Sequence, residues 1–311
     1  LYLTTGLVHP AFNVQRKYLE LIDEQSIEIP TQGQVDHPVL NYQQITKNAD
    51  KETLEELILK IRKIYFAMIA TLDHMLGKLF EAIDKMDLKE STYIIFTGDH
   101  GEMAMEHGQI LKRTMYEPSI HVPMIISGPG IDSGKREEGL VSLIDIFPTL
   151  MDMAGVEHPQ GLDGETLLPL LTGGDERKRD WIFSEYHGDR CNTGTFMIRK
   201  GKWKYINYIG YDPVLFNLKE DPWEVDNLAR GRADIIEEME GILYRNFNPE
   251  EIDMRAKNYD KENFRKWRQQ ELKKGTYREK MSLIYSGYDR VSIGDVMAWT
   301  DEDEAKIEDW L

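Results

Sequence analysis

The spacing of apolar residues predicts one long helix in the first third of the chain. From Asp50 to Phe80 apolar side chains recur every three or four residues, as one buried helix face requires. A second, short helical stretch follows and ends at Met86. Residues 142–154 have the same periodicity and stop before Gly155, a residue type suited to the left-handed position just after a helix.

Three short runs predict strands in this same part of the chain. They are rich in β-branched, aromatic or aliphatic residues and comprise Leu1–Thr5, Ser91–Thr97 and Val122–Ser127. The second run ends at Gly98, as expected of a buried strand that leads into a loop. Because a helix precedes a buried strand here, the order of elements predicts an α/β fold with parallel pairing.

After about residue 175 the pattern changes to short strands. Lys200-Gly201-Lys202 has the composition of a hairpin turn between two of them, so we expect a small antiparallel sheet. A helix follows, and then a densely charged surface helix. We expect the strands at residues 181–184, 195–199 and 203–206, and the helices at residues 234–244 and 258–280. We therefore expect two parts, residues 1–175 and residues 176–311.

Composition limits the kinds of partner. The 311 residues are 41% hydrophobic and carry a formal charge of −17, which is typical of a folded globular protein and unfavourable for binding nucleic acid. No apolar run reaches the roughly 18 residues that a membrane-spanning helix needs. Cys191 is the single cysteine and forms no intrachain disulfide, and the chain has no Asn-x-Ser/Thr sequon. These features leave the cellular compartment open.

The densest group of chemically active residues is Thr97-Gly98-Asp99-His100-Gly101-Glu102, just past the end of a predicted strand. Ligands bind at such strand ends in α/β sheets. A neighbouring carboxylate and imidazole on a glycine-flanked loop are able to hold one hard cation such as Ca²⁺ or Mg²⁺. The alternative is a loop in which Asp99 caps the next helix and His100 is only solvated. The six residues alone leave both interpretations open.

The continuation of this segment resembles a known family. Residues 98–130, GDHGEMAMEHGQILKRTMYEPSIHVPMIISGPG, are similar to the second signature region of the sulfatases, which belong to the alkaline phosphatase superfamily. Further similarities follow the family's order over most of residues 1–229: LVHP, YFAMIATLDHMLGKL, LVSLIDIFPTLMDMAG, LDGETLLPLLTG and LFNLKEDPWEVDNLA. Residues 183–208, FSEYHGDRCNTGTFMIRKGKWKYINY, most resemble arylsulfatase K and its bacterial relatives.

The resemblance implies a fold and an activity. The fold is an α/β, alkaline phosphatase-like mixed sheet flanked by helices, present in part, followed by a small C-terminal antiparallel sheet with helices. The activity is hydrolysis of a sulfate ester on a sulfated carbohydrate, a uronate 2-sulfate by analogy with the arylsulfatase K group. The sequence names neither the sugar nor the oligomeric state.

The resemblance also implies residue roles. Asp99 and His100 match calcium ligands, whose remaining partners come from earlier in a full-length sulfatase. Lys112 matches the lysine that holds the oxygens of the sulfate ester, a role suited to a compact ammonium with three donors. His9 matches the histidine that contacts the sulfate and assists proton transfer to the leaving group. Without the resemblance, Lys112 would be read as a solvated lysine and His9 as a loop histidine.

Four further residues have weaker assignments. His107 either hydrogen-bonds a metal ligand or organises its loop. Arg113 either is solvated or helps the pocket attract anions. His187 matches a feature of the arylsulfatase K group and would face the sugar, so His187, Arg113 and His107 are candidate substrate-binding residues. His121 precedes a strand and is expected to be structural.

A basic group lies on the predicted hairpin, comprising Arg199, Lys200, Lys202 and Lys204. In a chain of charge −17 it is one candidate guide for a polyanionic glycan. The alternative is that alternation along a hairpin turns these side chains to solvent. The alternation favours a solvated face.

The nucleophile of a sulfatase is absent from these residues. Sulfatases use a formylglycine made within a Cys/Ser-x-Pro/Ala-x-Arg sequence, and no such sequence occurs here; Cys191 is followed by Asn-Thr-Gly-Thr. We therefore expect Cys191 to be a structural or free thiol and the chain to be the C-terminal part of a sulfatase. The formylglycine, and any signal for export to the periplasm, would lie upstream of residue 1.

Two other functions remain open from the sequence. One is a phosphodiesterase or phosphonate monoester hydrolase of the same superfamily, which also uses an Asp-His pair and a metal. The other is a catalytically incomplete fragment that binds anionic glycans.

Overall fold

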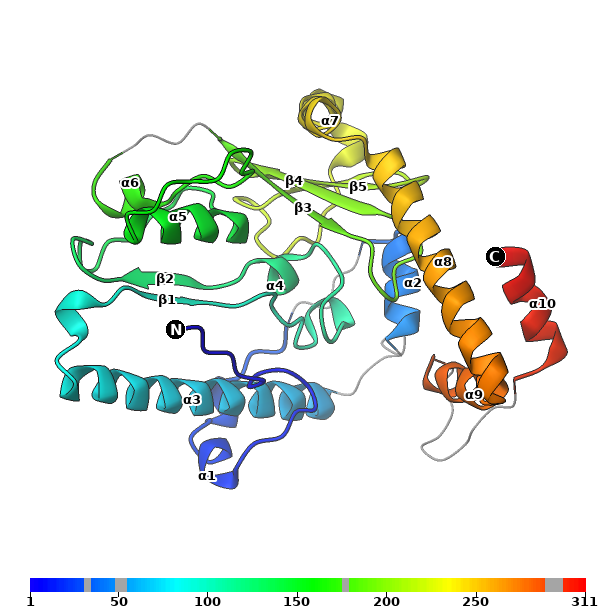
Figure 1. Ribbon diagram of the computed structural model, residues 1–311, viewed down its shortest axis with the longest axis horizontal. Coiled ribbons are helices and arrows are strands. Elements are labelled where there is room, and N and C mark those ends of the chain that lie inside the picture. The colour runs from blue at the N-terminus through cyan, green and yellow to red at the C-terminus, as the bar shows by residue number, and fades with distance from the viewer. Residues whose placement is uncertain (31–34, 48–54, 175–178, 289–298) are drawn as a thin grey trace.

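A computed structural model describes residues 1–30, 35–47, 55–174, 179–288 and 299–311 (Figure 1). The helices in these ranges are α1 (Arg16–Leu19), α2 (Pro38–Thr46), α3 (Glu55–Lys85), α4 (Glu117–Ile120), α5 (Ile146–Met153), α6 (Leu168–Leu171), α7 (Ala233–Asn246), α8 (Pro249–Lys274), α9 (Tyr277–Tyr288) and α10 (Asp301–Trp310). The strands are β1 (Ile94–Thr97), β2 (Met124–Ser127), β3 (Trp181–Tyr186), β4 (Thr195–Lys200), β5 (Trp203–Tyr208) and β6 (Val214–Asn217).

The long predicted helix is confirmed as α3. It runs without a break to Lys85, so the separate stretch predicted up to Met86 belongs to the same helix. Its predicted start at Asp50 lies outside the described residues. Two glutamates occupy its first turn, where the helix dipole stabilises negative charge. In Figure 1, α3 extends along one side of the molecule with α1 beneath it.

The first sheet differs from the sequence prediction. β1 and β2 pair antiparallel, with Ile94 opposite Ser127 and Thr97 opposite Met124, so the prediction of parallel pairing is wrong. The chain between them holds one 3₁₀ turn and one short α-helix, α4. It holds no long helix that packs back on the sheet, as a parallel crossover needs. Leu1–Thr5 is not a strand either. It pairs with no strand that the structure describes, and both Leu1 and Tyr2 are exposed.

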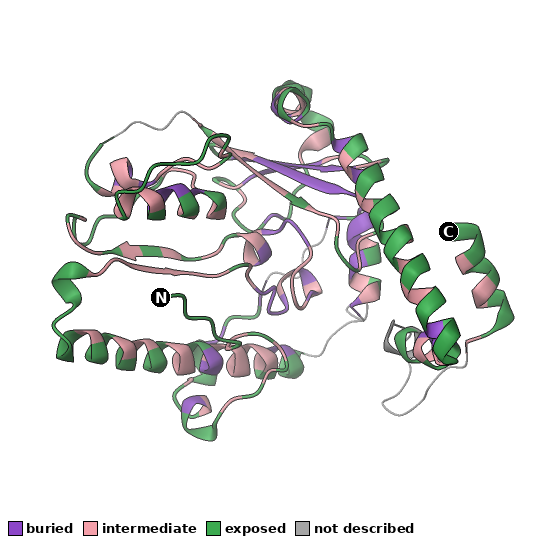
Figure 2. Cartoon of the chain, viewed as in Figure 1, coloured by how far each residue is buried: buried purple, intermediate pink, exposed green. Residues whose placement is uncertain are grey.

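The second sheet confirms the antiparallel prediction. Its strands lie in the order β3-β4-β5-β6, and every neighbouring pair is antiparallel. Gly201 takes a φ of +52° in the predicted hairpin turn, a conformation that glycine adopts without steric cost. β6 was not predicted. Every residue of β5 is buried, because both faces of this sheet are covered (Figure 2).

Two apolar clusters lie on the two faces of β4, β5 and β6. One face packs against α7, through Met239, Ile242 and Leu243. The other face packs against residues from the first part of the chain, including Val39, Met103 and Tyr116. The predicted division at 175 and 176 falls outside the described residues, and the two-part organisation stays a prediction. The second cluster joins the two predicted parts in one core.

The remaining helices match the sequence pattern in most respects. α5 ends before Gly155, which has a φ of +65°, and α7 covers the predicted helix at 234–244. The charged segment forms two helices instead of one. Gly275, at a φ of +72°, ends α8, and its N–H and that of Thr276 donate to the carbonyls of Leu272 and Glu271. α8 is largely exposed (Figure 2). No helix in the described ranges is long and apolar enough to span a bilayer.

Candidate functional site

The loop between β1 and α4 carries most of the candidate site residues. Its tight coil includes five non-glycine residues with positive φ: Ala104, Met105, His107, Leu111 and Arg113. Backbone hydrogen bonds from Met103 to Leu111 and from Met105 to Gln109 hold the coil. At Gly101, a Cβ would lie 2.0 Å from the carbonyl oxygen of Pro118, so only glycine fits there. The loop is therefore a rigid support for the side chains it presents.

Lys112 and His9 meet although 103 positions separate them in the chain. Lys112 Nζ lies 2.8 Å from His9 Nε2, and His9 Nδ1 lies 2.6 Å from the carbonyl oxygen of Pro10. Because a carbonyl only accepts, Nδ1 carries the imidazole proton and Nε2 accepts from the ammonium. The side chain of His9 is exposed, and that of Lys112 is half-buried. The two predicted catalytic residues thus form one hydrogen-bonded pair at the surface.

Asp99 and His100 lie beside this pair. The ring centroids of His9 and His100 are 6.4 Å apart. His100 Nδ1 lies 3.0 Å from the carbonyl oxygen of Gly101, so this nitrogen donates and the lone pair of Nε2 stays available. His100 Nε2 is 3.6 Å from Asp99 Oδ2, and the Asp99 side chain is 86% exposed.

A divalent cation would find a partial set of ligands in this pair. The tautomer of His100, fixed by a backbone carbonyl, is the one that metal-ligating histidines commonly adopt. A carboxylate oxygen and an imidazole nitrogen at this separation are able to contact one ion. No group of three or more His, Cys, Asp or Glu residues that would complete such a site occurs among the described residues. The two residues fit part of a cation site.

Arg113 and His107 have other surroundings. Arg113 Nε donates to Asp189 Oδ1 at 2.8 Å, and the hydroxyl of Tyr186 donates to the carbonyl oxygen of Asp189 at 3.1 Å. His107 is 2% exposed and stacks on Tyr116 with ring centroids 3.9 Å apart. These contacts support the loop-organising alternative for His107. Its role in substrate binding, like that of Arg113, stays a prediction.

Two family models match the part of the chain that contains these residues. The family model described as "Sulfatase" matches residues 1–156, which include His9, Asp99, His100 and Lys112. The chain belongs to the sulfatase family. A second model, "N-sulphoglucosamine sulphohydrolase, C-terminal", matches residues 105–247. The two matches overlap over residues 105–156, a range that includes Lys112.

Named relatives agree with this sulfatase assignment. The chain is 38% identical to arylsulfatase K of Mus musculus, over 86% of this chain and 53% of the relative. Among solved structures, it is similar to phosphonate monoester hydrolase of Agrobacterium radiobacter, with a TM-score of 0.66 and 31% identity over 75% of this chain and 53% of that one. It is also similar to a protein solved with its substrate D-glucosamine-2-N,6-O-disulfate, with a TM-score of 0.58 and 26% identity over 65% of this chain and 45% of that one. The chain thus spans about half the length of these relatives.

These neighbours confirm the predicted alkaline phosphatase-like α/β class.

Two further histidines of this sulfatase chain contact nearby carboxylates. His187 follows β3, is 19% exposed in its side chain, and places Nε2 3.5 Å from Glu185 Oε2. Its role in facing a sugar stays a prediction. His121 Nδ1 lies 3.0 Å from Glu117 Oε2, and this hydrogen bond raises the pKa of His121. The contact agrees with the structural role expected of His121.

Lys204 of the basic hairpin does not face solvent as the alternation favours, although Lys202 does. Lys204 is fully buried, and its Nζ donates to Glu224 Oε1 at 2.6 Å and to Glu117 Oε1 at 2.8 Å. Arg199 also lies near Glu117, at 3.5 Å, and Lys200 pairs with Asp180 and Glu238. The prediction of a solvated hairpin is wrong for Lys204, because acidic groups of other elements pack on this side of the sheet.

Sequence reasoning missed Lys47, which directly follows α2 and supports the loop that carries Lys112. Lys47 Nζ donates to Gln109 Oε1 at 2.7 Å, and Gln43 donates to the carbonyl oxygen of Arg113 at 2.6 Å. Lys47 is 4% exposed. Burial, reinforced by the positive charge of Arg113, lowers the pKa of Lys47 to about 7. A polar stretch such as Gln43-Gln44-Ile45-Thr46-Lys47 gives no signal of this burial.

The lowered pKa of Lys47 predicts a pH-dependent stability. In an unfolded chain the lysine pKa is about 10.4, so between about pH 7 and 10 the unfolded state binds more protons than the folded state. The contribution of Lys47 to the free energy of unfolding therefore rises with pH over this window. We expect urea denaturation at pH 7, 8 and 9 to show a stability gain in the wild type that Lys47→Met lacks. Lys89→Met, which alters an exposed lysine, should retain the gain. Parallel pH profiles for the wild type and Lys47→Met would contradict this account.

Proposed function

We propose that this chain forms part of the catalytic site of a sulfatase that removes sulfate from a sulfated carbohydrate. The observation that carries the proposal is the pair formed by Lys112 and His9, joined at 2.8 Å within the region that matches the sulfatase family. An ammonium beside an imidazole suits an ester whose cleavage develops negative charge on the departing oxygen.

The two side chains have different roles in this proposal. Lys112 has donors to hold the nonbridging oxygens of the ester and to stabilise their growing charge. As Lys112 turns toward the anion, Nε2 of His9 is free to take up a proton from solvent. The resulting imidazolium then donates that proton to the leaving oxygen. The carbonyl of Pro10 holds the other nitrogen, Nδ1, in place and so keeps the ring oriented. This orientation is what a proton donor needs.

Two groups complete the proposed site. Asp99 and His100 would hold a calcium ion, which supplies positive charge for binding and polarising the sulfate. The nucleophile would be a formylglycine from a sequence outside these residues, and Cys191 is not that nucleophile. Cys191 Sγ instead donates to the carbonyl oxygen of Thr193 at 2.8 Å. The residues of this chain would then bind the ester, orient it and move the proton.

We propose a uronate 2-sulfate as the substrate, by analogy with the arylsulfatase K relatives at 38% identity. The relative solved with a glucosamine disulfate supports a sulfated sugar more generally. One observation favours a second function, since the phosphonate monoester hydrolase is 31% identical and has a TM-score of 0.66. Hydrolysis of phosphonate monoesters is therefore the alternative.

A side-by-side assay separates the two functions. The polypeptide that carries both this chain and the formylglycine sequence would be given a 2-O-sulfated uronate disaccharide and an aryl phosphonate monoester. The proposal predicts faster release of sulfate, measured by ion chromatography. Faster turnover of the phosphonate would favour the alternative, and no turnover of either would leave only a glycan-binding role.

A further inference from the structure

A cavity of about 560 Å³ lies where α2, the loop after β3, α8 and α10 come together. Its walls include three aromatic side chains, Tyr42, Phe264 and Trp310. Polar groups surround them, from Thr46, Asp189, Arg190 and Asp260. The volume falls within the roughly 300–1,000 Å³ of typical small-ligand sites. None of these residues belongs to the pair of Lys112 and His9.

One ion pair connects the wall of the cavity to the loop that carries Lys112. Asp189 lines the cavity and also accepts the hydrogen bond from Arg113 at 2.8 Å. Arg113 follows Lys112 directly in the chain. Arg113 therefore links the loop that carries Lys112 to the wall of the cavity.

The chemistry of the walls matches a sugar ring. Aromatic rings offer flat apolar faces that pack against the C–H faces of a pyranose, while carboxylate, guanidinium and hydroxyl groups hydrogen-bond its hydroxyls. Arg190 Nε is 3.9 Å from Asp189 Oδ2. The formal charges of Arg113 and Arg190 balance those of Asp189 and Asp260. In a chain of net charge −17, this balance allows a segment of an anionic glycan to approach.

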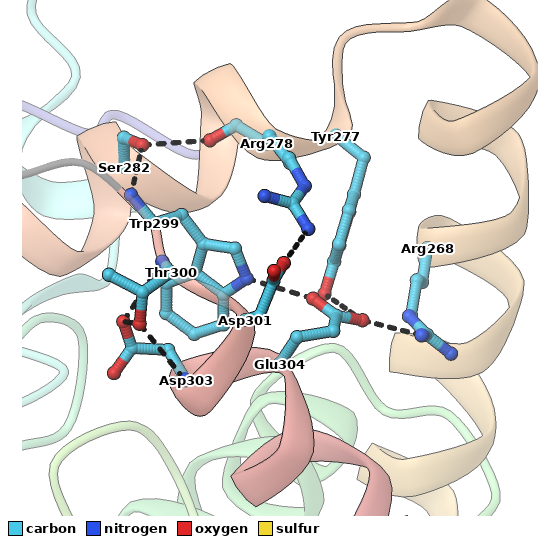
Figure 3. Close-up of polar contacts among 9 residues, drawn as sticks. All are labelled: Arg268, Tyr277, Arg278, Ser282, Trp299, Thr300, Asp301, Asp303 and Glu304. Carbon is cyan, nitrogen blue, oxygen red and sulfur yellow. Dashed lines mark hydrogen bonds and ion pairs between the residues drawn. The ribbon is translucent and has the colours of Figure 1, made fainter.

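The wall formed by α10 is held firmly by contacts on α8 and α9 (Figure 3). Glu304 accepts hydrogen bonds from Trp299 Nε1 at 2.8 Å, from Arg268 Nη2 at 2.5 Å and from Tyr277 at 3.4 Å. Thr300 caps the helix by accepting from the N–H of Asp303. The ring of Phe264 meets that of Trp310 edge-on, with centroids 5.8 Å apart. These contacts place Trp310, which is 44% exposed, at the cavity.

We infer that this cavity is a binding subsite for a second pyranose ring of the substrate, apart from the sulfated residue. The inference rests on the proposed function, since it assigns another sugar of the same substrate to a second place on the same chain. Trp310, Phe264 and Tyr42 pack against the ring. Arg190 and Asp260 bond its hydroxyls. The subsite gives the protein affinity for an oligosaccharide beyond that for a single sulfated sugar.

The test uses the whole chain and two probes, a 2-O-sulfated glycosaminoglycan tetrasaccharide and the same tetrasaccharide after chemical desulfation. Isothermal titration calorimetry gives a Kd for each. We expect Trp310→Ala and Tyr42→Ala to weaken binding of the desulfated probe by about tenfold, as expected when an aromatic ring that contacts the ligand is removed. Trp223→Ala is the matched control, because Trp223 is 53% exposed and lies outside the cavity lining. Circular dichroism melts confirm that each variant is folded.

The outcomes distinguish the subsite from the proposed function. Lys112→Ala should weaken binding of the sulfated probe and leave binding of the desulfated probe unchanged. Loss in the ring variants without any effect of Lys112→Ala would support the subsite and count against the sulfatase site. Wild-type affinity for the desulfated probe in both folded ring variants would overturn the subsite. So would a wild-type chain that does not bind the desulfated probe.

Discussion

Replacing Lys112 with alanine is expected to lower kcat/KM for a sulfate ester by about 10²–10³-fold, the loss typical of removing one donor to a developing oxyanion. The reason is that Lys112 Nζ, 2.8 Å from His9 Nε2, is the donor that the loop presents beside the histidine. The measurement is sulfate release by the polypeptide that includes the nucleophile sequence. Most of the loss should appear in kcat, because the contact strengthens as charge develops.

Two variants control this result. Lys89→Ala removes an exposed lysine outside the site and should leave kcat/KM unchanged. Lys112→Arg keeps the positive charge but presents a planar fork in place of a compact ammonium, so it should recover only part of the rate. Activity within a factor of about two of the wild type in Lys112→Ala would exclude Lys112 from the reaction, given the loss expected for an oxyanion donor.

Replacing Lys204 with methionine is expected to lower the free energy of unfolding by about 3–5 kcal/mol. Lys204 is fully buried between Glu224 and Glu117, so its removal leaves two carboxylates together without their cation. Burial alone raises the pKa of Glu117, but hydrogen bonds from His121 and Lys204 outweigh it and hold that pKa well below its ordinary value. Urea denaturation at pH 7 measures the loss.

The double variant Lys204→Met/Glu224→Gln tests the cause. Burial raises the pKa of Glu224, and Lys204 opposes this rise. Removing the buried charge should therefore recover part of the stability lost in Lys204→Met alone. Lys200→Ala, which breaks partly exposed pairs with Asp180 and Glu238, should cost less than about 1 kcal/mol. Equal losses for Lys204→Met and Lys200→Ala would contradict the account.

The local sequence pattern predicts the helices and turns of this fold better than it predicts which strands pair and in which direction. The period of α3 and the turn at Gly201 are both visible in the sequence, because each depends on neighbouring residues. The antiparallel pairing of β1 with β2 depends instead on the path of the chain between them. β6 was missed because four residues after Pro213 are a short signal, although every one of them is buried.

The basic hairpin shows why the alternation of residue types predicts the wrong environment for Lys204. Alternation predicts one buried and one solvated face, but all six residues of β5 are buried. Ile206 and Tyr208 lie in the cluster that contains Tyr116, while Trp203 and Tyr205 lie in the cluster packed on α7. Lys204 is therefore buried on the first of these two faces, where Glu117 follows Tyr116. No pattern within residues 199–204 contains this information.

The candidate site was accessible from the sequence only through resemblance. Lys112 is a single lysine in a loop and His9 a single histidine near the start of the chain, so neither has a local signal of function. Their contact joins positions 103 apart. Lys47 matches no quoted motif and was missed. The pairing of Arg113 with Asp189 joins two loops that lie 76 positions apart. Long-range contacts of this kind depend on the whole fold.

The most direct test of the paired Lys112 and His9 site is a titration with inorganic sulfate, the product of the proposed reaction. The chain would carry ¹⁵N-labelled histidine, and NMR would follow the Nε2 and Nδ1 signals of His9 at constant ionic strength. The account predicts a saturable shift of the Nε2 signal as Lys112 turns from His9 to the anion, and its absence in Lys112→Ala. A chloride titration serves as the control. His9 signals that do not move with sulfate, or that move equally in Lys112→Ala, would contradict the central claim.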